Sequence, residues 1–502
     1  MKRVWLFAAA AALAFAGAAR ADTPLISAAQ AGDHAAALKL VAPATAKDAA
    51  DDGTTALMWA AHNGDAELAS ALIAAGADVK AKNAYDTTAM REAATSGSTP
   101  VLKVLLDAGA DPESPSVEGQ TSLMIVARTA NLEAAKLLLE HGAKVNAAET
   151  SEGQTALMQA ATQRQEAMSR LLIKAGANVN THSRVHDNDI RVSAEPRVRY
   201  QPSGGLTALT IAARDDCLGC ARALVEAGAK INDVDPDGVT ALLNATLNCL
   251  FDLAKYLVEA GADVNRWDWW GRTALWATVD FNSLPRGGRS DRPSVDDTTG
   301  LTMIKLLLDK GANPNAQLKL QAPMRAVGPD RGADLIMGTG MTPLMRAARG
   351  GDVQAADLLL KAGALPDLPL NREWRDTIGG LTPLMVASGL ANQVNDTRGK
   401  LITQDEAVKT VKRLIEGHAD VNARDDRGNT AIMGAVFRGW NDVIKTLIEA
   451  GADPYQANNA GKTAMDIARG TFAGGGRQQL VTLDPGSAAL IEKLKPIKTA
   501  SN

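Results

Sequence analysis

The sequence predicts an all-α solenoid of about twelve helix-turn-helix repeats, joined by short hairpin fingers and interrupted by loop insertions. Three observations lead to this fold class. A short marker recurs along the 502 residues at a nearly fixed interval. Within each copy, apolar residues stand three and four apart, as on one face of a helix. Aromatic residues make up only 4% of a chain that is 46% hydrophobic, which favours close-packed Ala and Leu helices over a sandwich or a barrel.

The marker has the form Gly-x-Thr, or a close equivalent, and it sets the length of the repeat. It stands at Gly53, Asp86, Gly119, Gly153, Gly205, Gly238, Gly271, Gly340, Gly380, Gly428 and Gly461. The successive separations are 33, 33, 34, 52, 33, 33, 69, 40, 48 and 33 residues. A further copy begins at Thr23. The recurrent separation of 33 is therefore the repeat, and each longer one is a repeat plus an insertion.

Each copy begins with a glycine turn and a first helix, as residues 53–62 illustrate. Gly53 tolerates the positive φ that many turns require. Thr55 carries a hydroxyl that can cap a helix N-terminus, and two later copies have Pro at the position after the cap. The apolar face of this helix is formed by Leu57, Met58, Ala60 and Ala61. These residues predict a helix of about two turns.

The rest of the copy, residues 63–83, predicts a second helix and a polar finger. Asn63, Gly64 and Asp65 end the first helix and cap the second. The helical spacing then returns at Leu68, Ala69, Leu72 and Ile73. Gly76 suits the left-handed position that ends a helix, and the polar residues after it predict an extended finger. Neither helix can bury its apolar face alone, so each copy needs a neighbour on both sides.

This unit resembles the ankyrin repeat, and the resemblance covers nearly the whole chain after residue 21. The shared pattern is G-x-T-P-L at the first helix, A-A-x-x-G-x before the second, and L-L-x-x-G-A-D-x-N after it. The Gly-Ala pair recurs at Gly76, Gly109, Gly142, Gly176, Gly228, Gly261, Gly311, Gly363 and Gly451. The resemblance implies a non-catalytic scaffold or inhibitor that recognises a protein partner through its concave face and fingers.

The chain departs from the family pattern at one position of the first helix, where the family commonly has His. This chain has Met58, Met124, Met158, Met345, Met385 and Met433 there. We interpret the row as core filling by an adaptable apolar side chain. A methionine row that binds copper is the alternative, but no His or Cys accompanies it.

Residues 1–21 predict a signal peptide that is cleaved after Ala21. Lys2 and Arg3 precede an apolar run over residues 4–15, and Ala19-Arg20-Ala21 is a small-x-small cleavage site. The alternative is an uncleaved anchor, but the run is short for a membrane span. We therefore expect export to the bacterial periplasm or beyond. Removal of this segment changes the net charge from −4 to −7, which gives no reason to expect a nucleic-acid partner.

The predicted organisation has four parts. They are the signal peptide 1–21, an N-terminal repeat block 22–281 with an insertion at 182–203, an interrupted repeat 282–339 with insertions at 282–299 and 316–339, and a C-terminal block with its cap at 340–502. Shorter insertions fall at 368–379 and 392–405. All insertions are rich in Pro, Gly, Arg and Asp and lack sustained periodicity, so we expect them to be loops. After signal removal we expect no membrane insertion, and we expect a monomer.

The cysteines are the first candidates for chemistry. Cys217 and Cys220 stand at the turn between the two helices of one copy, and Cys249 lies near the same turn of the next. In an oxidising compartment a structural disulfide is the simplest interpretation, and both Cys217–Cys220 and Cys220–Cys249 fit. Free buried thiols are the alternative. Redox catalysis is disfavoured because Asp215 and Asp216 would oppose a thiolate, and because the copy is not an α/β unit.

A weak candidate for a metal site lies in the insertion at 182–203. His182, His186, Asp187 and Asp189 are all side chains that zinc accepts. Since no helix fixes their geometry, we interpret them as a solvated loop and expect no metal. The chain has no HExxH, GxSxG or P-loop motif, so we expect no catalytic residue, no cofactor and no enzyme.

Partner-binding candidates are therefore sought on the surface. Trp267, Trp269 and Trp270 crowd one short finger, where indoles are unusual unless they contact a partner or fold back onto residues 282–299. Trp59 and His62 fall on the first-helix face. The same register gives Phe281, Arg346, Arg349, Phe437 and Arg438, and the fingers add Tyr85 and Trp374. Aromatic and Arg side chains at these positions suit a protein partner.

Three other functions stay open from the sequence. One is a metal-linked or redox-linked periplasmic accessory protein that uses His182 and His186 or Cys217 and Cys220. Another is an effector secreted beyond the cell that acts on a host protein. A purely structural component of the cell envelope is the third.

Overall fold

The computed structural model describes residues 23–192, 198–283, 296–320, 339–371, 379–390, 402–470, 484 and 486–494. The chain forms two compact units. The first comprises Met1–Arg184 with Leu206–Ala229, and the second comprises Val185–Gly205 with Lys230–Asn502. The predicted boundaries at residues 281 and 339 lie within the second unit. The predicted signal peptide and Trp374 lie outside the described residues.

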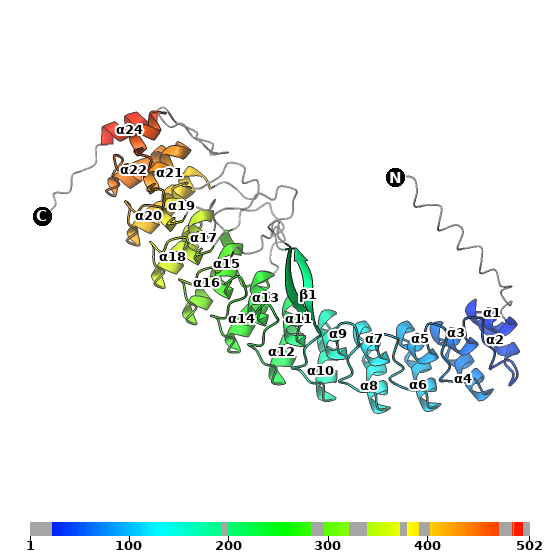
Figure 1. Ribbon diagram of the computed structural model, residues 1–502. Coiled ribbons are helices and arrows are strands. Elements are labelled where there is room, and N and C mark those ends of the chain that lie inside the picture. Colours follow the sequence, from blue (N-terminus) through cyan, green and yellow to red (C-terminus); the bar gives the residue numbers. More distant parts are fainter. Residues whose placement is uncertain are drawn as a thin grey trace, which may run out of the picture. The chain divides into compact units, whose positions relative to one another are not determined.

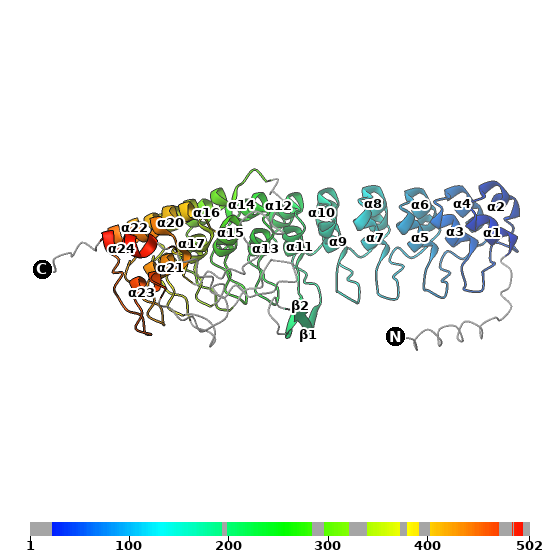
Figure 2. The same cartoon turned by 90° about the horizontal axis from the view of Figure 1, so that it is seen from above.

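Both units are stacks of paired helices (Figure 1). The first unit contains α1 (Pro24–Gln30), α2 (His34–Leu40), α3 (Ala56–His62), α4 (Ala66–Ala74), α5 (Ala89–Ser96), α6 (Thr99–Asp107), α7 (Ser122–Thr129), α8 (Leu132–Glu140), α9 (Ala156–Thr162), α10 (Glu166–Lys174), α11 (Ala208–Arg214) and α12 (Leu218–Glu226). Within each unit the first helices of the repeats form one layer and the second helices another, with the fingers on the side of the first helices (Figure 2). The predicted helix-turn-helix architecture is confirmed.

The second unit continues the same pattern and adds a pair of strands. Its elements are β1 (Val185–Val192), β2 (Val198–Gly204), α13 (Ala241–Leu247), α14 (Phe251–Glu259), α15 (Ala274–Ser283), α16 (Gly300–Asp309), α17 (Pro343–Gly350), α18 (Val353–Lys361), α19 (Pro383–Ala387), α20 (Gln404–Glu416), α21 (Ala431–Arg438), α22 (Asn441–Glu449), α23 (Ala464–Ala468) and α24 (Gly486–Leu494). Among the described helices of both units, none has the length and apolarity needed to cross a bilayer.

The caps predicted from the sequence are present at both helices of the repeat. In α3 the Thr55 hydroxyl accepts the Met58 N–H at 3.3 Å, and threonines take the same place before most later first helices. In α4 the Asp65 carboxylate accepts the Leu68 N–H at 2.9 Å. Each cap satisfies an N–H that the helix cannot pair internally. Capping therefore fixes where these short helices begin.

The core lies between the two helix layers and consists mostly of Leu and Ala. The six methionines of the first helices are buried within it, at 2% exposure or less. Their burial agrees with the interpretation of the row as core filling. The small alanines of the first helices let neighbouring pairs approach closely, so each pair buries its apolar faces against the next.

The insertion at residues 182–203 was expected to be a loop. It instead contains the antiparallel strands β1 and β2. Ile190 pairs with Tyr200, and Val192 pairs with Val198. β-branched and aromatic residues recur in both segments, and such residues favour extended pairing. The loop expectations for the other insertions fall largely outside the described residues.

An asparagine after the second helix couples most repeats to the next one. In the second unit, Asn315 Nδ2 donates to the Gly363 carbonyl at 3.0 Å, and its Oδ1 accepts the Leu365 N–H at 2.7 Å. Asn422 bonds in the same way to Gly451 and Asp453. An amide suits this place because it both donates and accepts.

One junction has an aspartate in place of the asparagine. The Asp367 carboxylate accepts the Asp420 N–H at 3.0 and 3.1 Å, but an ionised carboxylate offers no donor to the carbonyl of the next repeat. Burial raises the pKa of Asp367, the Asp420 N–H bond lowers it, and the Asp420 charge raises it further. The net shift is upward, so the folded state holds the proton of Asp367 more tightly than the unfolded chain.

We predict that Asp367→Asn stabilises the second unit by roughly 1 kcal/mol at neutral pH, because it restores the missing hydrogen bond. The pKa of Asp367 is higher in the folded protein than in the unfolded chain. The contribution of this carboxyl to wild-type stability is therefore greatest at a pH below its pKa in the unfolded chain, and it is lost as the pH rises through its pKa in the folded protein. The gain from the variant should therefore shrink at low pH. Urea unfolding at pH 7 and near pH 4 measures both effects.

The matched control is Asn315→Asp, which places a carboxylate at an ordinary junction and should destabilise the unit at pH 7. Equal stability of Asp367→Asn and the wild type at pH 7 would contradict the assignment of this position as a coupling site.

Candidate partner-binding surface

The first-helix face of the first unit is open to solvent. We define this face by the fourth and seventh positions of the first helices. The fourth positions are Ser27, which is exposed, then Trp59, Glu92, Ile125 and Gln159, which are half-buried, and Ile211, which is buried. The seventh positions Gln30, His62, Thr95, Arg128 and Arg214 are exposed, and Thr162 is half-buried. Side chains from α3, α7, α9 and α11 therefore present aromatic, polar and basic groups along one face.

An aromatic and charged cluster lies at the α3 end of this face. The Trp59 and His62 rings meet edge to face, with 5.7 Å between their centroids. His62 Nδ1 lies 2.8 Å from Glu92 Oε2 of α5, so one repeat holds the side chain of the previous one. Glu92 was not among the predicted residues. Its position in the register of α5 is the signal that could have identified it.

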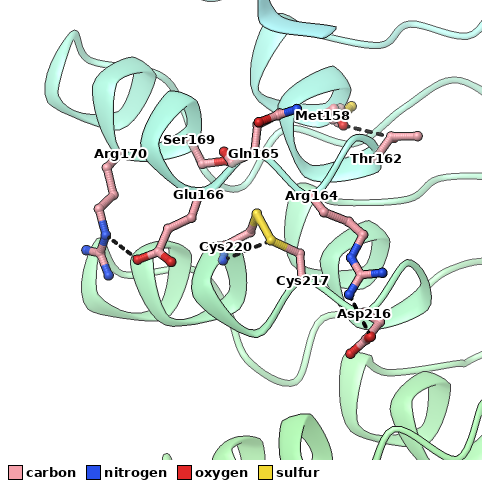
Figure 3. The surroundings of a disulfide bond; sticks show 10 residues. All are labelled: Met158, Thr162, Arg164, Gln165, Glu166, Ser169, Arg170, Asp216, Cys217 and Cys220. Carbon is pink, nitrogen blue, oxygen red and sulfur yellow. Dashed lines mark hydrogen bonds and ion pairs between the residues drawn. A yellow bond between two sulfur atoms is a disulfide. The ribbon is translucent and has the colours of Figure 1, made fainter. Parts of the chain in front are cut away.

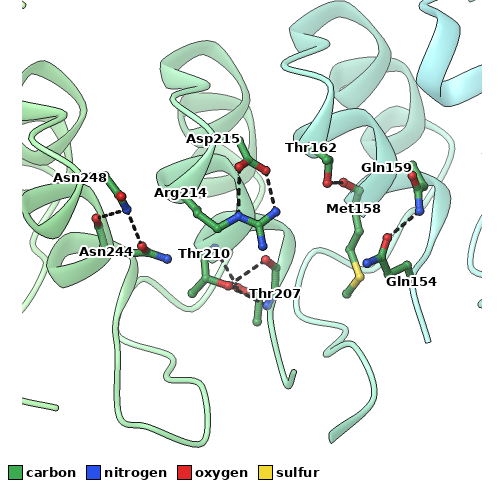
Figure 4. Close-up of polar contacts among 10 residues, drawn as sticks. All are labelled: Gln154, Met158, Gln159, Thr162, Thr207, Thr210, Arg214, Asp215, Asn244 and Asn248. Carbon is green, nitrogen blue, oxygen red and sulfur yellow. Dashed lines mark hydrogen bonds and ion pairs between the residues drawn. The ribbon is translucent and has the colours of Figure 1, made fainter. Parts of the chain in front are cut away.

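The polar groups further along the face are held in place by local hydrogen bonds (Figure 4). Gln159 Nε2 donates to Gln154 Oε1 at 2.5 Å. The Arg214 guanidinium donates twice to Asp215, through Nε at 3.0 Å and Nη2 at 2.7 Å, which raises the pKa of Arg214. Since these side chains are already ordered, a partner that contacts them loses less conformational entropy on binding.

The first-helix face of the second unit is buried along α15, α17, α19 and α21. Arg346 is 5% exposed, and its Nε donates to Asp280 Oδ1 at 2.5 Å in a buried ion pair. Arg349 and Phe437 are buried as well. These three residues were predicted to lie on an open surface, and that prediction is wrong. A helix that is covered on all sides does not show in its sequence which side faces a neighbour.

Two other residues of the predicted set are half-buried in the second unit. Phe281 packs edge to face against Phe251, with centroids 5.4 Å apart. The Arg438 guanidinium lies 4.8 Å from the centre of the Trp440 ring. Burial lowers the pKa of Arg438, and the charge of Arg349 lowers it further. Both residues therefore pack within the stack instead of projecting from it.

The tryptophan finger of the second unit projects two of its three indoles. Trp267 and Trp269 are 50% and 51% exposed, whereas Trp270 is half-buried with Arg272 at 4.9 Å from its ring centre. The Lys319 ammonium lies 3.0 Å from the centre of the Trp267 ring. In the first unit, Tyr85 is the corresponding exposed aromatic, at 70% exposure.

A buried carboxylate shapes this finger. Asp268 has no exposed surface and accepts from the Trp270 N–H at 3.1 Å, the Arg272 N–H at 2.9 Å and Arg272 Nε at 2.7 Å. Burial raises the pKa of Asp268, and the Arg272 charge opposes that effect. Asp268, Arg272 and Lys319 were not among the predicted residues. The four-residue separation of an acid and an arginine across the finger turn is the signal that could have identified the first two.

The structure distinguishes between the two disulfide pairings that the sequence left open. Cys217 and Cys220 form a disulfide, and Cys249 lies outside it (Figure 3). Cys217 occupies the N-cap of α12, where its Sγ accepts the Cys220 N–H at 3.1 Å. Other repeats place Asp65, Asn131 or Asp352 at this position. The sulfur of Cys217 therefore takes the place of the polar N-cap side chain of the other repeats.

The two acids beside this disulfide are paired with arginines, although the sequence suggested that they would oppose a thiolate. Asp215 pairs with Arg214, and Asp216 Oδ2 accepts from Arg164 Nη2 at 2.8 Å. The two cysteines are nevertheless 5% and 0% exposed. A thiol that attacks a disulfide needs access to its sulfur, so this burial favours a structural role over exchange.

The histidine and aspartate candidates at the start of the hairpin are described only in part. His182 is exposed, His186 and Asp187 belong to β1, and the side chain of Asp189 lies outside the description. Within the described residues, no three His, Cys, Asp or Glu side chains are placed to hold a metal ion.

Comparison with known proteins identifies the repeats. The family model "Ankyrin repeats (3 copies)" matches residues 10–83, 25–116, 90–183, 188–268 and 401–474, and the model "Ankyrin repeat" matches residues 339–370. These matches together span more than half of the chain.

Curated relatives share only part of this chain. The ankyrin repeat and KH domain-containing protein mask-1 of Caenorhabditis elegans is 33% identical over 24% of this chain and 4% of its own length. The human ankyrin repeat domain-containing protein 63 is 33% identical over 26% of this chain and 30% of its own length. The chain thus spans less than a third of these relatives, so their activities do not transfer to it.

Solved ankyrin domains also match. The human ASB11 ankyrin repeat domain is 21% identical and aligns over 48% of this chain and 99% of its own length, with a TM-score of 0.39. The ankyrin repeat domain of Bcl-3 is 22% identical and aligns over 45% and 95%, with a TM-score of 0.38.

We predict that Cys217→Ala with Cys220→Ala destabilises the first unit by up to about 2 kcal/mol through the lost cross-link, the chain-entropy value for so short a loop. The variant Cys217→Asn with Cys220→Ala should recover about 1 kcal/mol of that loss, because Asn131 shows that asparagine can cap such a helix. Amide hydrogen exchange of α12, compared with α8 as an internal reference, measures both changes. Equal loss in the two variants would contradict the capping role.

Proposed function

The chain belongs to the family of ankyrin repeat proteins, and from this membership we propose that it is a non-catalytic scaffold or inhibitor that binds a protein partner. The observation that carries the proposal is the open first-helix face of the first unit. Trp59, His62, Arg128 and Arg214 lie on this face, and local bonds order several of its side chains. Aromatic and arginine side chains are the residues that contribute most to protein interfaces.

The proposed partner surface therefore contains fewer residues than the surface predicted from the sequence. Trp59 and His62 of the first unit remain proposed contact residues, with Glu92 against His62 and with Arg128 and Gln159 on later first helices. The corresponding face of the second unit is excluded because its arginines and phenylalanine are buried. We infer that the first unit provides the rigid docking face.

We further propose that the chain acts after export, once residues 1–21 have been removed. The charged start, the apolar run and the small-x-small sequence support this. The Cys217–Cys220 disulfide supports it independently, since disulfides persist in oxidising compartments and are rare in the cytosol. Fractionation of a bacterial culture into periplasm and medium distinguishes a chain that acts in the periplasm from one that acts on a host protein outside the cell.

The redox-linked accessory role is a weaker alternative. One observation favours it, which is that Cys217 sits at a helix N-terminus, a position that stabilises thiolates. The burial of both sulfurs opposes it. Measurement of insulin reduction by the purified chain, with dithiothreitol as the reductant, decides between the two roles.

We predict that a photoreactive amino acid at Arg128 on the first-helix face cross-links one defined protein in living cells. The same group at Lys136, exposed on the second helix of that repeat, is the control and should give none. Detection of the cross-linked band by gel and its identification by mass spectrometry test the proposal. Capture from Lys136 as strong as from Arg128 would contradict it.

We predict that the protein recovered from the periplasm or medium of an expressing bacterium begins at Asp22. Replacing Ala19 and Ala21 by Asp should leave the uncleaved precursor in the membrane fraction, because the cleavage site requires small residues. Intact mass and N-terminal sequencing measure the start of the chain. A mature protein that retains residues 1–21 and remains in the cytoplasm would contradict export.

A further inference from the structure

The repeat formed by α1 and α2 is the first of the described stack, and it packs on the repeat formed by α3 and α4 (Figure 1). An inner repeat of a solenoid is held by two neighbours, whereas an end repeat is held by one. End repeats are therefore among the first parts of a solenoid to open locally. The contacts between the first two repeats decide how often this one opens.

A cleft lies at the junction between the first two repeats. Its volume is about 240 Å³, and its lining includes Ala29, His34, Asn63, Asp65 and Leu68. Because apolar packing is incomplete there, polar contacts take a larger share in holding the two repeats together. One of these contacts does not titrate, since Asn63 Nδ2 donates to the Ala29 carbonyl at 2.7 Å. The other is made by His34.

His34 begins α2, and its ring lies between two carboxylates of the second repeat. Its Nδ1 is 2.7 Å from Asp65 Oδ2, and its Nε2 is 3.5 Å from Glu67 Oε2. Asp65 is also the N-cap of α4, where its other oxygen accepts the Leu68 N–H. A protonated imidazole can donate to both carboxylates, whereas a neutral ring has one N–H and turns a lone pair toward the other carboxylate. The arrangement therefore fits the protonated ring.

The charges around His34 favour its proton. Asp65 and Glu67 face the ring from α4, and α1 has no charged residue. Within α2, Asp33 is the N-cap and Lys39 stands in the last turn, while the helix dipole at the N-terminus opposes a positive charge. The hydrogen bond from Asp65 raises the pKa of His34, partial desolvation lowers it, and the charges of Asp65 and Glu67 raise it. The net shift of the pKa is upward.

We propose that His34 is a pH-dependent latch between the first two repeats, whose protonated ring holds α2 against α4 and whose deprotonation loosens the first repeat. The sign follows from linkage. Because the pKa of His34 is higher in the folded protein, the latch contributes its full stability at a pH below the pKa in the unfolded chain. That contribution is lost as the pH rises through the pKa in the folded protein. The bond from Asn63 persists, so the repeat loosens without being released.

The latch acts on the end of the first-helix face. Ser27 and Gln30 of the first repeat are exposed at the fourth and seventh positions of α1. A loosened first repeat leaves Trp59 and His62 of α3 at the end of the ordered face. The latch is a property of the stack and does not rest on the proposed protein partner, so its test needs no partner.

Amide hydrogen exchange of the full chain at about pH 5.5 and about pH 8.5, corrected for the intrinsic exchange rate at each pH, tests the proposal. The protection of α1 and α2 should be severalfold higher at the acidic pH. Helix α6 is the internal reference, because neither of its ends carries a histidine. In a chain labelled with carbon-13 at histidine Cε1, nuclear magnetic resonance should show that His34 titrates above the ordinary range of histidine.

Three variants separate the latch from other effects of pH. His34→Gln should lower the protection of α1 and α2 at the acidic pH and abolish the difference between the two pH values. Asp65→Asn removes the charge but keeps a cap on α4, since Asn131 caps α8 in the same way. It should reduce the pH difference and lower the pKa of His34. His141→Gln replaces an exposed histidine elsewhere in the first unit and should leave the difference unchanged.

Three outcomes would overturn the proposal. The first is equal protection of α1 and α2 at the two pH values in the wild type. The second is a pH difference that persists in His34→Gln. The third is a His34 ring that titrates at or below the ordinary pKa of histidine in the wild type.

Discussion

Every other feature of this molecule depends on the inability of one repeat to bury its own apolar surface. A pair of helices with five to thirteen residues each cannot stand alone in water, because short helices gain most of their stability from packing. Stacking solves this by burying Leu and Ala between neighbours, and polar groups then fix the register. The Asn315 amide and the finger hydrogen bonds are examples, since each satisfies two groups of adjoining repeats.

The same constraint decides which surfaces remain for a partner. Stacking buries the helix surfaces between neighbouring repeats, so the first-helix face and the fingers are the surfaces left for a partner to bind. In the first unit that face stays open and carries the Trp59, His62 and Glu92 cluster. In the second unit it is closed around the buried Arg346–Asp280 pair, and the exposed aromatic residues lie on the fingers instead. One kind of repeat thus presents two different surfaces.

The sequence predicted the repeats well because period, caps and apolar spacing all act locally. Thr55 and Asp65 cap the helices that they were expected to cap, and the methionines are in the core. The candidate site was predicted less well because exposure depends on contacts far apart in the chain. Arg346 stands in the same register as Trp59, but an aspartate 66 residues away buries it in an ion pair. Composition identified Trp267 and Trp269, but Lys319 reaches Trp267 across a repeat interrupted by insertions.

Hydroxyl-radical footprinting of the native chain, read residue by residue by mass spectrometry, tests the contrast between the two faces most directly. The account predicts rapid oxidation of Trp59, Trp267 and Trp269, and protection of Trp276, Met345 and Phe437 until the chain is unfolded. Oxidation of Phe437 and Met345 as fast as that of Trp59 would show that the second unit is open as well, and would contradict the assignment of the docking face.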